Sequence, residues 1–516
     1  MFSILRAKGL SISNPLRWQL ILKGNHMRIV TPVVIFTVLL FFLPTVPYAA
    51  TYYVSPLGND SLAGSSANPW KTLQHAANSV NGGDTVLISS GNYAGFRAAT
   101  GGSAGFPITF RADTGALVII NSASSEGIKG SIIEIEGYDW WVLDGLEVTG
   151  ASRNAGIDIR VADHITVRNC NCHHNRKWGI FTAFADDFTV EYNECSYAVE
   201  EHGIYHSNSG DRAVIRYNTC HHNAACGIQI NADPSMGGDG ISSNCIVTHN
   251  ILYENGILGG AAINLASVRD SLIGNNLIYN NYAGGIAAWD DGQGNQWGSK
   301  NNRYYNNTVH MPATGRWAVN LKNGSTGSRV WNNLLIHENG ARGDLEIDSS
   351  SLTDFSSDHN VLTRVSVDDT VMDLPEWQNT YSQDALSFSQ TASQTFVSSG
   401  SDYHLLDTAH AINAGATLLE ITDDLDGNIR PQGANYDMGA YEFVFAQCPD
   451  CSGDAVVLDD ITFLSNTTCE CVGDRFIIIG AGVVIEPGAI VTFKSPMVKG
   501  QDGFHAPKNA TVHIRQ

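Results

Sequence analysis

Short runs in which apolar and polar residues alternate recur along the middle of the chain. They begin with "GIDIRV", "GIFTAF", "GIYHSN" and "GIQINA" and continue with "AINLAS", "GIAAWD", "AVNLKN" and "DLEIDS". Alternation with a period of two predicts β-strands that bury one face. The aligned apolar residues follow one another at steps of 23, 24, 24, 35, 23, 33 and 26, and they are Ile157, Ile180, Ile204, Ile228, Ile263, Ile286, Val319 and Leu345.

A second strand follows in most of these units and ends in asparagine, as in "VRNCNCHHN", "VIRYNTCHHN" and "LIGNNLIYNN". Such short strands cannot bury an apolar face alone, so we expect them to stack coil on coil into a solenoid. The asparagines are then expected to form a stacked amide ladder at the turns. Cys172, Cys195 and Cys220 share the same period and predict an inward stack of small thiols.

Parity within each strand predicts which side chains face outward. Residues one and three positions after each aligned apolar residue point away from the core. His206 has inward parity, and we interpret it as a core histidine bonded to Thr182 or to the backbone. The first outward column is Asp158, Phe181, Tyr205, Gln229, Asn264, Ala287, Asn320 and Glu346, and the second is Arg160, Ala183, Ser207, Asn231, Ala266, Trp289, Lys322 and Asp348.

Neighbours in a column should lie about 4.8 Å apart, so distant parts of the chain form one surface. The two long steps mark insertions at residues 232–244 and 291–300, and insertions in solenoids commonly gather on the binding face. The amides and aromatic rings beside them suit an extended polysaccharide. The predicted substrate-binding residues are Gln229, Asn231, Asn264, Trp289 and Asn320.

Two further segments make a family resemblance specific. "TYYVSPLGNDSLAGSSANPWKTLQHAANSVNGGDTVLISSGNY" resembles the first block of many secreted bacterial β-helix proteins, and "DLDGNIRPQGANYDMGAYEF" resembles their closing segment. Residues 51–445 thus resemble a right-handed parallel β-helix protein of the pectate-lyase-like superfamily. The predicted fold class is all-β, with a helix after Pro69 that caps the open end of the solenoid. The superfamily contains lyases, hydrolases, epimerases and non-catalytic members, so the resemblance implies the fold more than the reaction.

The two ends of the chain differ in sequence from the solenoid repeats and predict separate segments. Residues 27–50 have the layout of a secretory signal peptide, and residues 1–26 look like an upstream extension. The apolar run is too short to span a bilayer, so we expect a secreted or cell-surface protein with no stable membrane insertion after cleavage. Residues 446–516 predict a small β module for attachment, sorting or capping. Its four cysteines are expected to form two disulfides, and the mature chain is expected to be a monomer.

Composition and charge limit the partners. Glycine accounts for 51 of the 516 residues and charged residues for 16%, which is typical of turn-rich sheet proteins. Lys and Arg number 30 against 51 Asp and Glu, a formal net charge of −21. This charge excludes nucleic acid as a partner, since it would repel phosphates. It also opposes a polyanionic sugar chain, unless a basic stripe or a bound cation reverses the field locally.

The first functional hypothesis is uronate chemistry, by β-elimination or by C5 epimerisation. Either reaction must neutralise the C6 carboxylate and remove the C5 proton. The acidic net charge favours neutralisation by Ca²⁺. The candidate catalytic residues are Lys322, Tyr205, Glu201 and His202, and the candidate calcium ligands are Asp233, Asp239, Asp290 and Asp291.

Other interpretations stay open at this stage. Asp290 or Asp291 could pair with Asp233 for glycoside hydrolysis, which in an inverting enzyme needs carboxylates about 6.5–9.5 Å apart. A non-catalytic, adhesive or polysaccharide-binding β-helix is the third possibility, and the C-terminal module supports it. Single residues also have structural interpretations: Lys322 could pair with Asp348 on the next coil, and Glu201 and His202 could cap a turn.

Overall fold

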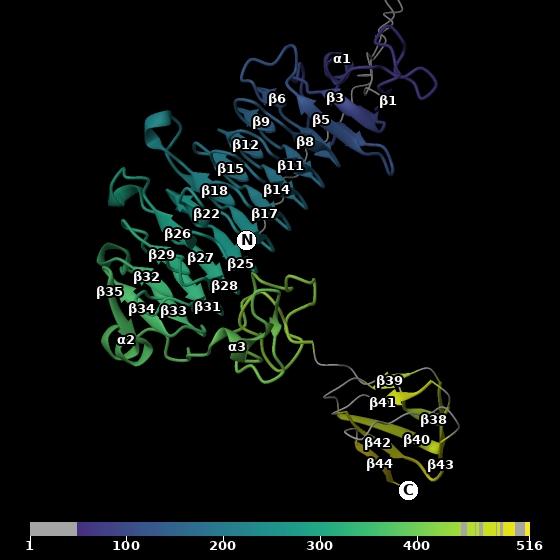
Figure 1. The fold of residues 1–516 in the computed structure, drawn as a ribbon, viewed down its shortest axis with the longest axis vertical. Coiled ribbons are helices and arrows are strands. Elements are labelled where there is room, and N and C mark those ends of the chain that lie inside the picture. The colour runs from purple at the N-terminus through teal and green to yellow at the C-terminus, as the bar shows by residue number, and fades with distance from the viewer. Residues whose placement is uncertain are drawn as a thin grey trace, which may run out of the picture. The chain divides into compact units, whose positions relative to one another are not determined.

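The computed structural model describes residues 49–444 and, with short gaps, 451–515. The predicted leader and nearly all of the predicted signal peptide lie outside the described residues. From Thr51 onward the chain winds into coils, and nearly all strands of the coils pair in parallel with their counterparts in the next coil (Figure 1). The predicted all-β parallel solenoid is confirmed.

Three long sheets make up the walls of the solenoid. Sheet 1 has twelve strands: β1 (Thr51–Val54), β2 (Thr85–Ile88), β4 (Ile108–Ala112), β7 (Trp141–Asp144), β10 (Thr166–Arg168), β13 (Thr189–Glu191), β16 (Val214–Arg216), β20 (Ile246–Thr248), β24 (Leu272–Gly274), β27 (Arg303–Tyr305), β30 (Arg329–Trp331) and β33 (Ser356–Asp358). Sheet 2 has ten: β3 (Gly91–Ala94), β5 (Val118–Ser122), β8 (Glu147–Thr149), β11 (Asn171–His173), β14 (Glu194–Ser196), β17 (Thr219–His221), β21 (Ile251–Tyr253), β25 (Leu277–Tyr279), β28 (Thr308–Met311) and β31 (Leu334–His337).

Sheet 3 has eleven strands and carries the aligned apolar residues. They are β6 (Ile133–Glu136), β9 (Ile157–Arg160), β12 (Ile180–Ala183), β15 (Ile204–Ser207), β18 (Ile228–Asn231), β22 (Ala261–Ala266), β26 (Gly284–Trp289), β29 (Val319–Leu321), β32 (Leu345–Ile347), β34 (Arg364–Val367) and β35 (Thr370–Asp373). The last pair of strands is antiparallel, whereas the others are parallel. A small two-stranded sheet joins β19 (Ser242–Ser243) to β23 (Val268–Arg269) beside the first insertion.

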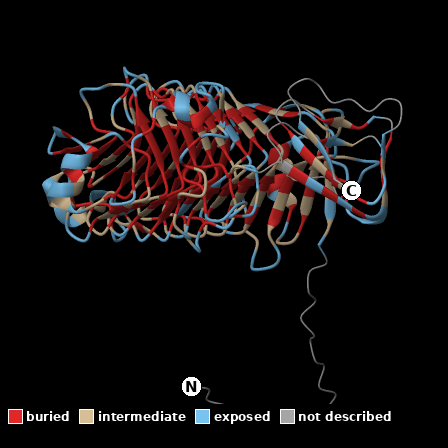
Figure 2. Cartoon of the chain, turned by 90° about the horizontal axis from the view of Figure 1, so that it is seen from below, coloured by how far each residue is buried: buried red, intermediate tan, exposed pale blue. Residues whose placement is uncertain are grey.

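The interior of the coils is the hydrophobic core, as Figure 2 shows by its continuous band of buried residues. Ile180, Ile204 and Ile228 lie opposite one another and are fully buried. His206 also lies inside, where its Nδ1 is 2.7 Å from the Thr182 hydroxyl and its Nε2 is 2.9 Å from the Gly210 carbonyl oxygen. Both expectations for these inward positions are confirmed.

The inward thiol stack is confirmed as well. Cys172 pairs in register with Cys195, and Cys195 pairs with Cys220. All three are buried free thiols. Burial and the neighbouring thiols hold the pKa of Cys195 well above its usual value, so the thiol stays neutral and packs as an apolar group.

The asparagine ladder at the turn between sheets 1 and 2 is continuous. The side-chain amide of Asn250 donates to the Ile215 carbonyl oxygen at 2.9 Å and to Asn276 Oδ1 at 3.0 Å. Its own Oδ1 accepts from the backbone and side-chain amides of Asn218, both at 3.0 Å. The same pattern repeats up the stack, so each buried turn is satisfied by the coils beside it. The ladder residues are Asn193, Asn218, Asn250, Asn276, Asn307, Asn333 and Asn360.

Asn250→Ala is expected to destabilise the solenoid by at least about 3 kcal/mol, because it leaves several buried donors and acceptors without partners. Denaturant unfolding of the variant measures the loss. Asn121→Ala is the matched control, since Asn121 is exposed and its side chain makes one contact at 3.5 Å. Equal stability of the two variants would show that the ladder does not hold the coils together.

Helices are few and short, and α1 (Leu73–Ser79) comes near the start of the solenoid. Thr72 accepts from the amide of His75 and so caps α1, which packs against β1 and β3. This helix lies where the sequence placed it, while its role as a cap stays a prediction. The other helical elements are α2 (Leu374–Tyr381), α3 (Ala392–Thr395), η1 (Pro234–Met236), η2 (Asn295–Trp297) and η3 (Ser349–Ser351). None of these described helices is both long and apolar enough to cross a membrane.

The closing segment packs against the outer face of sheet 2. After β36 (Phe396–Ser398) and β37 (Asp402–Leu405), it buries Met438 and Ala440 against Leu277 and Leu334. The carboxylate of Asp424 accepts from the amides of Asp426, Asn428 and Glu442. "DLDGN" is therefore a turn that its first aspartate holds together through backbone amides.

The C-terminal module is also built from parallel strands, in smaller sheets than those of the solenoid. Its strands are β38 (Gly453–Leu458), β39 (Thr462–Phe463), β40 (Thr468–Ile479), β41 (Val484–Ile485), β42 (Ile490–Lys494), β43 (Val498–Gly500) and β44 (Thr511–Arg515), and every described pairing among them is parallel. Cys451 is bonded to Cys471, and Cys469 is also in a disulfide. The role of the module and its boundary at residue 446 stay predictions.

Candidate functional site

The outward face of sheet 3 forms the predicted vertical line of side chains. Tyr205 lies opposite Gln229, and Gln229 lies opposite Asn264. The line continues in register through Ala287, Asn320 and Glu346. Above these strands is a groove of about 600 Å³, lined by all five residues predicted to bind substrate.

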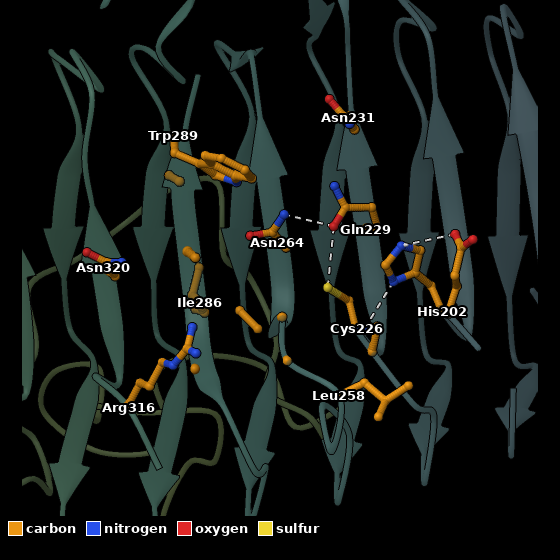
Figure 3. A pocket seen from close by; sticks show the side chains of 18 of the residues that line it. His202, Cys226, Gln229, Asn231, Leu258, Asn264, Ile286, Trp289, Arg316 and Asn320 are labelled. Carbon is orange, nitrogen blue, oxygen red and sulfur yellow. Dashed lines mark hydrogen bonds and ion pairs between the residues drawn. The ribbon is translucent and has the colours of Figure 1, made fainter. Parts of the chain in front are cut away.

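The amides in the floor of the groove are held in fixed orientations. Asn264 donates to Gln229 Oε1 at 2.8 Å, and the Cys226 thiol donates to the same oxygen at 3.3 Å (Figure 3). Asn231 donates to Asp291 Oδ2 at 3.1 Å. Three buried polar atoms of the groove have no hydrogen-bond partner among the described residues, a deficit that bound hydroxyl groups or water would relieve. These atoms are Asn231 Oδ1, Trp289 Nε1 and Asn320 Oδ1.

Glu201, His202 and Tyr205 line one end of the groove. His202 Nδ1 accepts from the Cys226 amide at 3.0 Å, which leaves the ring proton on Nε2, 3.8 Å from Glu201 Oε2. Glu201 Oε2 accepts from Trp178 Nε1 at 2.8 Å. Burial lowers the pKa of His202 to about 4 and raises the pKa of Tyr205. Most polar atoms of Glu201 and His202 thus already contact other groups of the protein.

His202 makes the stability of the fold depend on pH. The pKa of His202 is about 4 in the folded chain and about 6.5 when unfolded. The neutral ring therefore makes its full contribution to the free energy of unfolding above about pH 6.5, and this contribution is lost as the pH falls toward 4. Between pH 7 and pH 5 we expect the wild type to lose about 2 kcal/mol more stability than His202→Gln. Urea unfolding at both pH values measures the difference, and parallel losses would contradict the assignment.

Lys322 stands toward the other end of the groove. Its ammonium lies 3.4 Å from Glu346 Oε1 and 3.6 Å from an Asp369 oxygen. Glu346 is fully buried. The alternative partner that the sequence suggested, Asp348, instead accepts from the Asn323 amide at 2.7 Å and from the Ser350 hydroxyl at 2.9 Å. The pairing of Lys322 with Asp348 is therefore wrong.

Arg316 and Trp317 also line this end of the groove, and strand parity did not reveal them. They lie in the turn before β29, where no alternation exists. Figure 3 shows Arg316 rising into the groove beside Ile286. The ring of Trp317 is 4.9 Å from the Lys322 ammonium and 4.8 Å from the Arg342 guanidinium. Among the described residues Arg316 has no ion pair, so its charge is free to meet an anion.

The four candidate calcium ligands do not form a cluster. Asp290 is 2% exposed, and its oxygens accept from the amides of Gly292 and Gly294 and from Asn323 Nδ2. Asp233 and Asp239 accept from amides in their own loop. Burial raises the pKa of Asp291, and the charges of Asp233 and Asp290 add to it. Within the described part of the chain, no group of three or more His, Cys, Asp or Glu side chains could hold a metal ion. As arranged here, these residues do not fit calcium.

Comparison with known proteins identifies the class of this solenoid. The model of a Pel9A-like, right-handed beta helix region matches residues 52–320, which is more than half of the chain. The chain therefore belongs to the Pel9A-like right-handed β-helix family.

Two curated relatives and one solved structure are similar to the chain. Pectate lyase L of Dickeya dadantii is 29% identical over 160 residues, 28% of this chain and 36% of that protein. Pectate lyase PEL9 of Emericella nidulans is 29% identical over 140 residues, 23% of this chain and 34% of that protein. The chain thus spans about a third of the length of these relatives. The crystal structure of pectate lyase Pel9A is 18% identical, covers 77% of this chain and 97% of its own, and has a TM-score of 0.54, which supports the fold alone.

Proposed function

We propose that the chain is an exported enzyme that binds an extended, uronate-containing polysaccharide along the groove and cleaves it by β-elimination. The observation that carries the proposal is the pair of cations, Arg316 and Lys322, at one end of a groove floored with fixed amides. The pectate lyases to which the chain is similar support the choice of substrate class.

The shape of the groove favours an extended chain. Four strand spacings separate Tyr205 from Asn320, which corresponds to about 19 Å. Side-chain amides along this line offer hydrogen bonds to sugar hydroxyls, and the indole rings of Trp289 and Trp317 offer apolar faces. Tyr205 is too far from Lys322 to act on the same sugar residue, so we assign it to sugar contact.

The residues at the cationic end can carry out the elimination. Arg316 would neutralise the C6 carboxylate of the bound uronate, which makes the C5 proton easier to remove. Lys322, after its ammonium has lost a proton to solvent, would take the C5 proton as the C4–O bond breaks and the C4–C5 double bond forms. The leaving oxygen would take a proton from water. Glu346 and Asp369, which pair with the Lys322 ammonium in the free protein, would stabilise that ammonium again when the proton transfer re-forms it.

Hydrolysis by Asp290 is disfavoured by its contacts. A general acid or base must reach the substrate within hydrogen-bonding distance. The carboxylate of Asp290 is buried, and it is occupied by the amides of its own loop and by Asn323. We therefore assign Asp290 to shaping the second insertion, and we derive no catalytic step through a metal ion.

Product analysis on a panel of polymers tests the proposal. The mature chain is incubated with polygalacturonate, with alginate and with a neutral galactan, each with and without a chelator. An unsaturated product that absorbs ultraviolet light, formed from a uronate polymer only, is the expected result. New reducing ends without that absorbance would indicate hydrolysis, a changed C5 configuration in an uncut chain would indicate epimerisation, and binding without turnover would indicate an adhesive protein. Loss of activity with the chelator would indicate that Ca²⁺, rather than Arg316, neutralises the substrate carboxylate.

A further inference from the structure

Two arginines on sheet 1 lie directly opposite each other, away from the groove on sheet 3. Arg303 of β27 is the register partner of Arg329 of β30, so their Cα atoms are separated by about one strand spacing. Like charges in directly opposite positions destabilise a sheet unless a counter-charge lies between them. Among the described residues, the ion pair that this pair of arginines forms is a long one, 3.8 Å from Arg303 to Glu420.

Other outward-facing arginines of the same sheet each form a close ion pair with a carboxylate on the preceding strand. Arg168 is 2.9 Å from the carboxylate of Asp144 on the preceding strand, and Arg216 is 2.8 Å from that of Glu191. Arg303, in contrast, has its nearest carboxylate at 3.8 Å, on Glu420, and its buried Nε has no partner in the described part of the protein. Arg329 bonds to the Tyr305 hydroxyl and forms no ion pair with any described residue.

The two arginines line a depression of about 450 Å³ between sheet 1 and the closing segment. Asn244 and Asn301 lie at its rim, and both amides are exposed. Two acidic residues also line it: Asp270, whose Oδ1 accepts from Asn301 at 3.1 Å, and Glu420. The guanidinium groups thus face a hollow that also contains hydrogen-bonding groups suited to hydroxyls.

Two further cations adjoin residues of the lining in sequence, Arg269 next to Asp270 and Lys300 next to Asn301. Lys300 and Arg269 approach each other closely enough that the charge of Arg269, together with burial, lowers the pKa of Lys300. The backbone links the two segments, because the Asp270 amide donates to the Lys300 carbonyl oxygen at 3.0 Å. The residues that line the depression carry two positive and two negative charges, so an anion that took the place of Glu420 would meet a lining with net positive charge.

We propose that Arg303 and Arg329 form a second glycan-binding site, which takes the carboxylate or sulfate group of an acidic sugar. Paired guanidinium groups match planar or tetrahedral oxyanions with charge-assisted hydrogen bonds. Glu420 occupies the rim of this site in the free protein and leaves when the anion binds. The site does not depend on the reaction in the groove, and it would let the protein hold a polymer at a second point.

Calorimetric binding in a groove-disabled background tests the site. In the full chain carrying Arg316→Ala and Lys322→Ala, we expect trigalacturonate to bind in a salt-sensitive manner. Adding Arg303→Ala and Arg329→Ala should weaken that binding at least tenfold, while adding Arg168→Ala, the matched control, should leave it unchanged. Glu420→Gln should strengthen it, because it removes the competing carboxylate.

Three outcomes would overturn the proposal. Binding that is unchanged by the double arginine replacement would remove the site. Weaker binding in Glu420→Gln, together with a loss of thermal stability like that of the arginine variant, would show that the arginines only clamp the closing segment. If trigalacturonate bound no more tightly than inorganic sulfate, or no more tightly than neutral galactotriose, the site would not recognise acidic sugars. Because the readout is binding in a groove-disabled chain, failure here leaves the proposed lyase activity untouched.

Discussion

Lys322→Ala is expected to lower kcat on the uronate polymer about a thousandfold and to change KM much less, because a general base typically contributes 10²–10⁴-fold to the rate. The amine is the proposed acceptor of the C5 proton, and Glu346 and Asp369 would stabilise its charged form. Initial rates of ultraviolet absorbance increase, measured across substrate concentrations, separate kcat from KM.

Lys177→Ala provides a closely matched control for this variant. Lys177 also lies over a tryptophan ring, at 5.1 Å from Trp178, and also pairs with a glutamate, at 3.4 Å from Glu201. It does not line the groove. Its replacement should leave kcat within about twofold of the wild type. Comparable rates in the two variants would reject Lys322 as the base.

Arg316→Ala is expected to raise KM for a de-esterified uronate polymer between about 10-fold and 100-fold, because a hydrogen bond to a charged group contributes about 1.5–3 kcal/mol. Neutralising the substrate carboxylate by methyl esterification should remove most of this effect. Kinetics of the variant on esterified and de-esterified polymers provide the comparison.

Arg216→Ala is the control for the arginine replacement, since Arg216 lies on sheet 1 and is already paired with Glu191 at 2.8 Å. Its kinetics should match those of the wild type on both polymers. If Arg316→Ala impaired both polymers equally, the guanidinium would shape the groove rather than recognise the uronate. Activity equal to that of the wild type would place carboxylate recognition elsewhere.

The part of the site that lies on the strands could be predicted from the sequence, because strand parity fixes which side chains face outward. Side chains alternate strictly along a strand, so the steps between repeats are enough to align Tyr205, Gln229 and Asn264 from the sequence alone. The same argument placed His206 and Cys195 inside. These predictions depend on a period of two and on coil stacking, which the sequence displays directly.

Parity fails where side chains lean or where the chain leaves the strand. The alternative interpretation paired Lys322 with Asp348 in its own column, but the long Lys322 side chain reaches diagonally to Glu346 on the next strand. Arg316 and Trp317 lie in a turn, where alternation gives no direction. Asp290 is a candidate calcium ligand by its sequence, but in the structure the amides of its own loop occupy its carboxylate.

A crystal structure of Lys322→Ala with a bound uronate hexamer tests the central claim most directly. The account predicts sugar rings across β18, β22, β26 and β29, with hydroxyls on the Gln229–Asn264–Asn320 line and a carboxylate on Arg316. An unoccupied groove in crystals where the hexamer binds only to another face would contradict it.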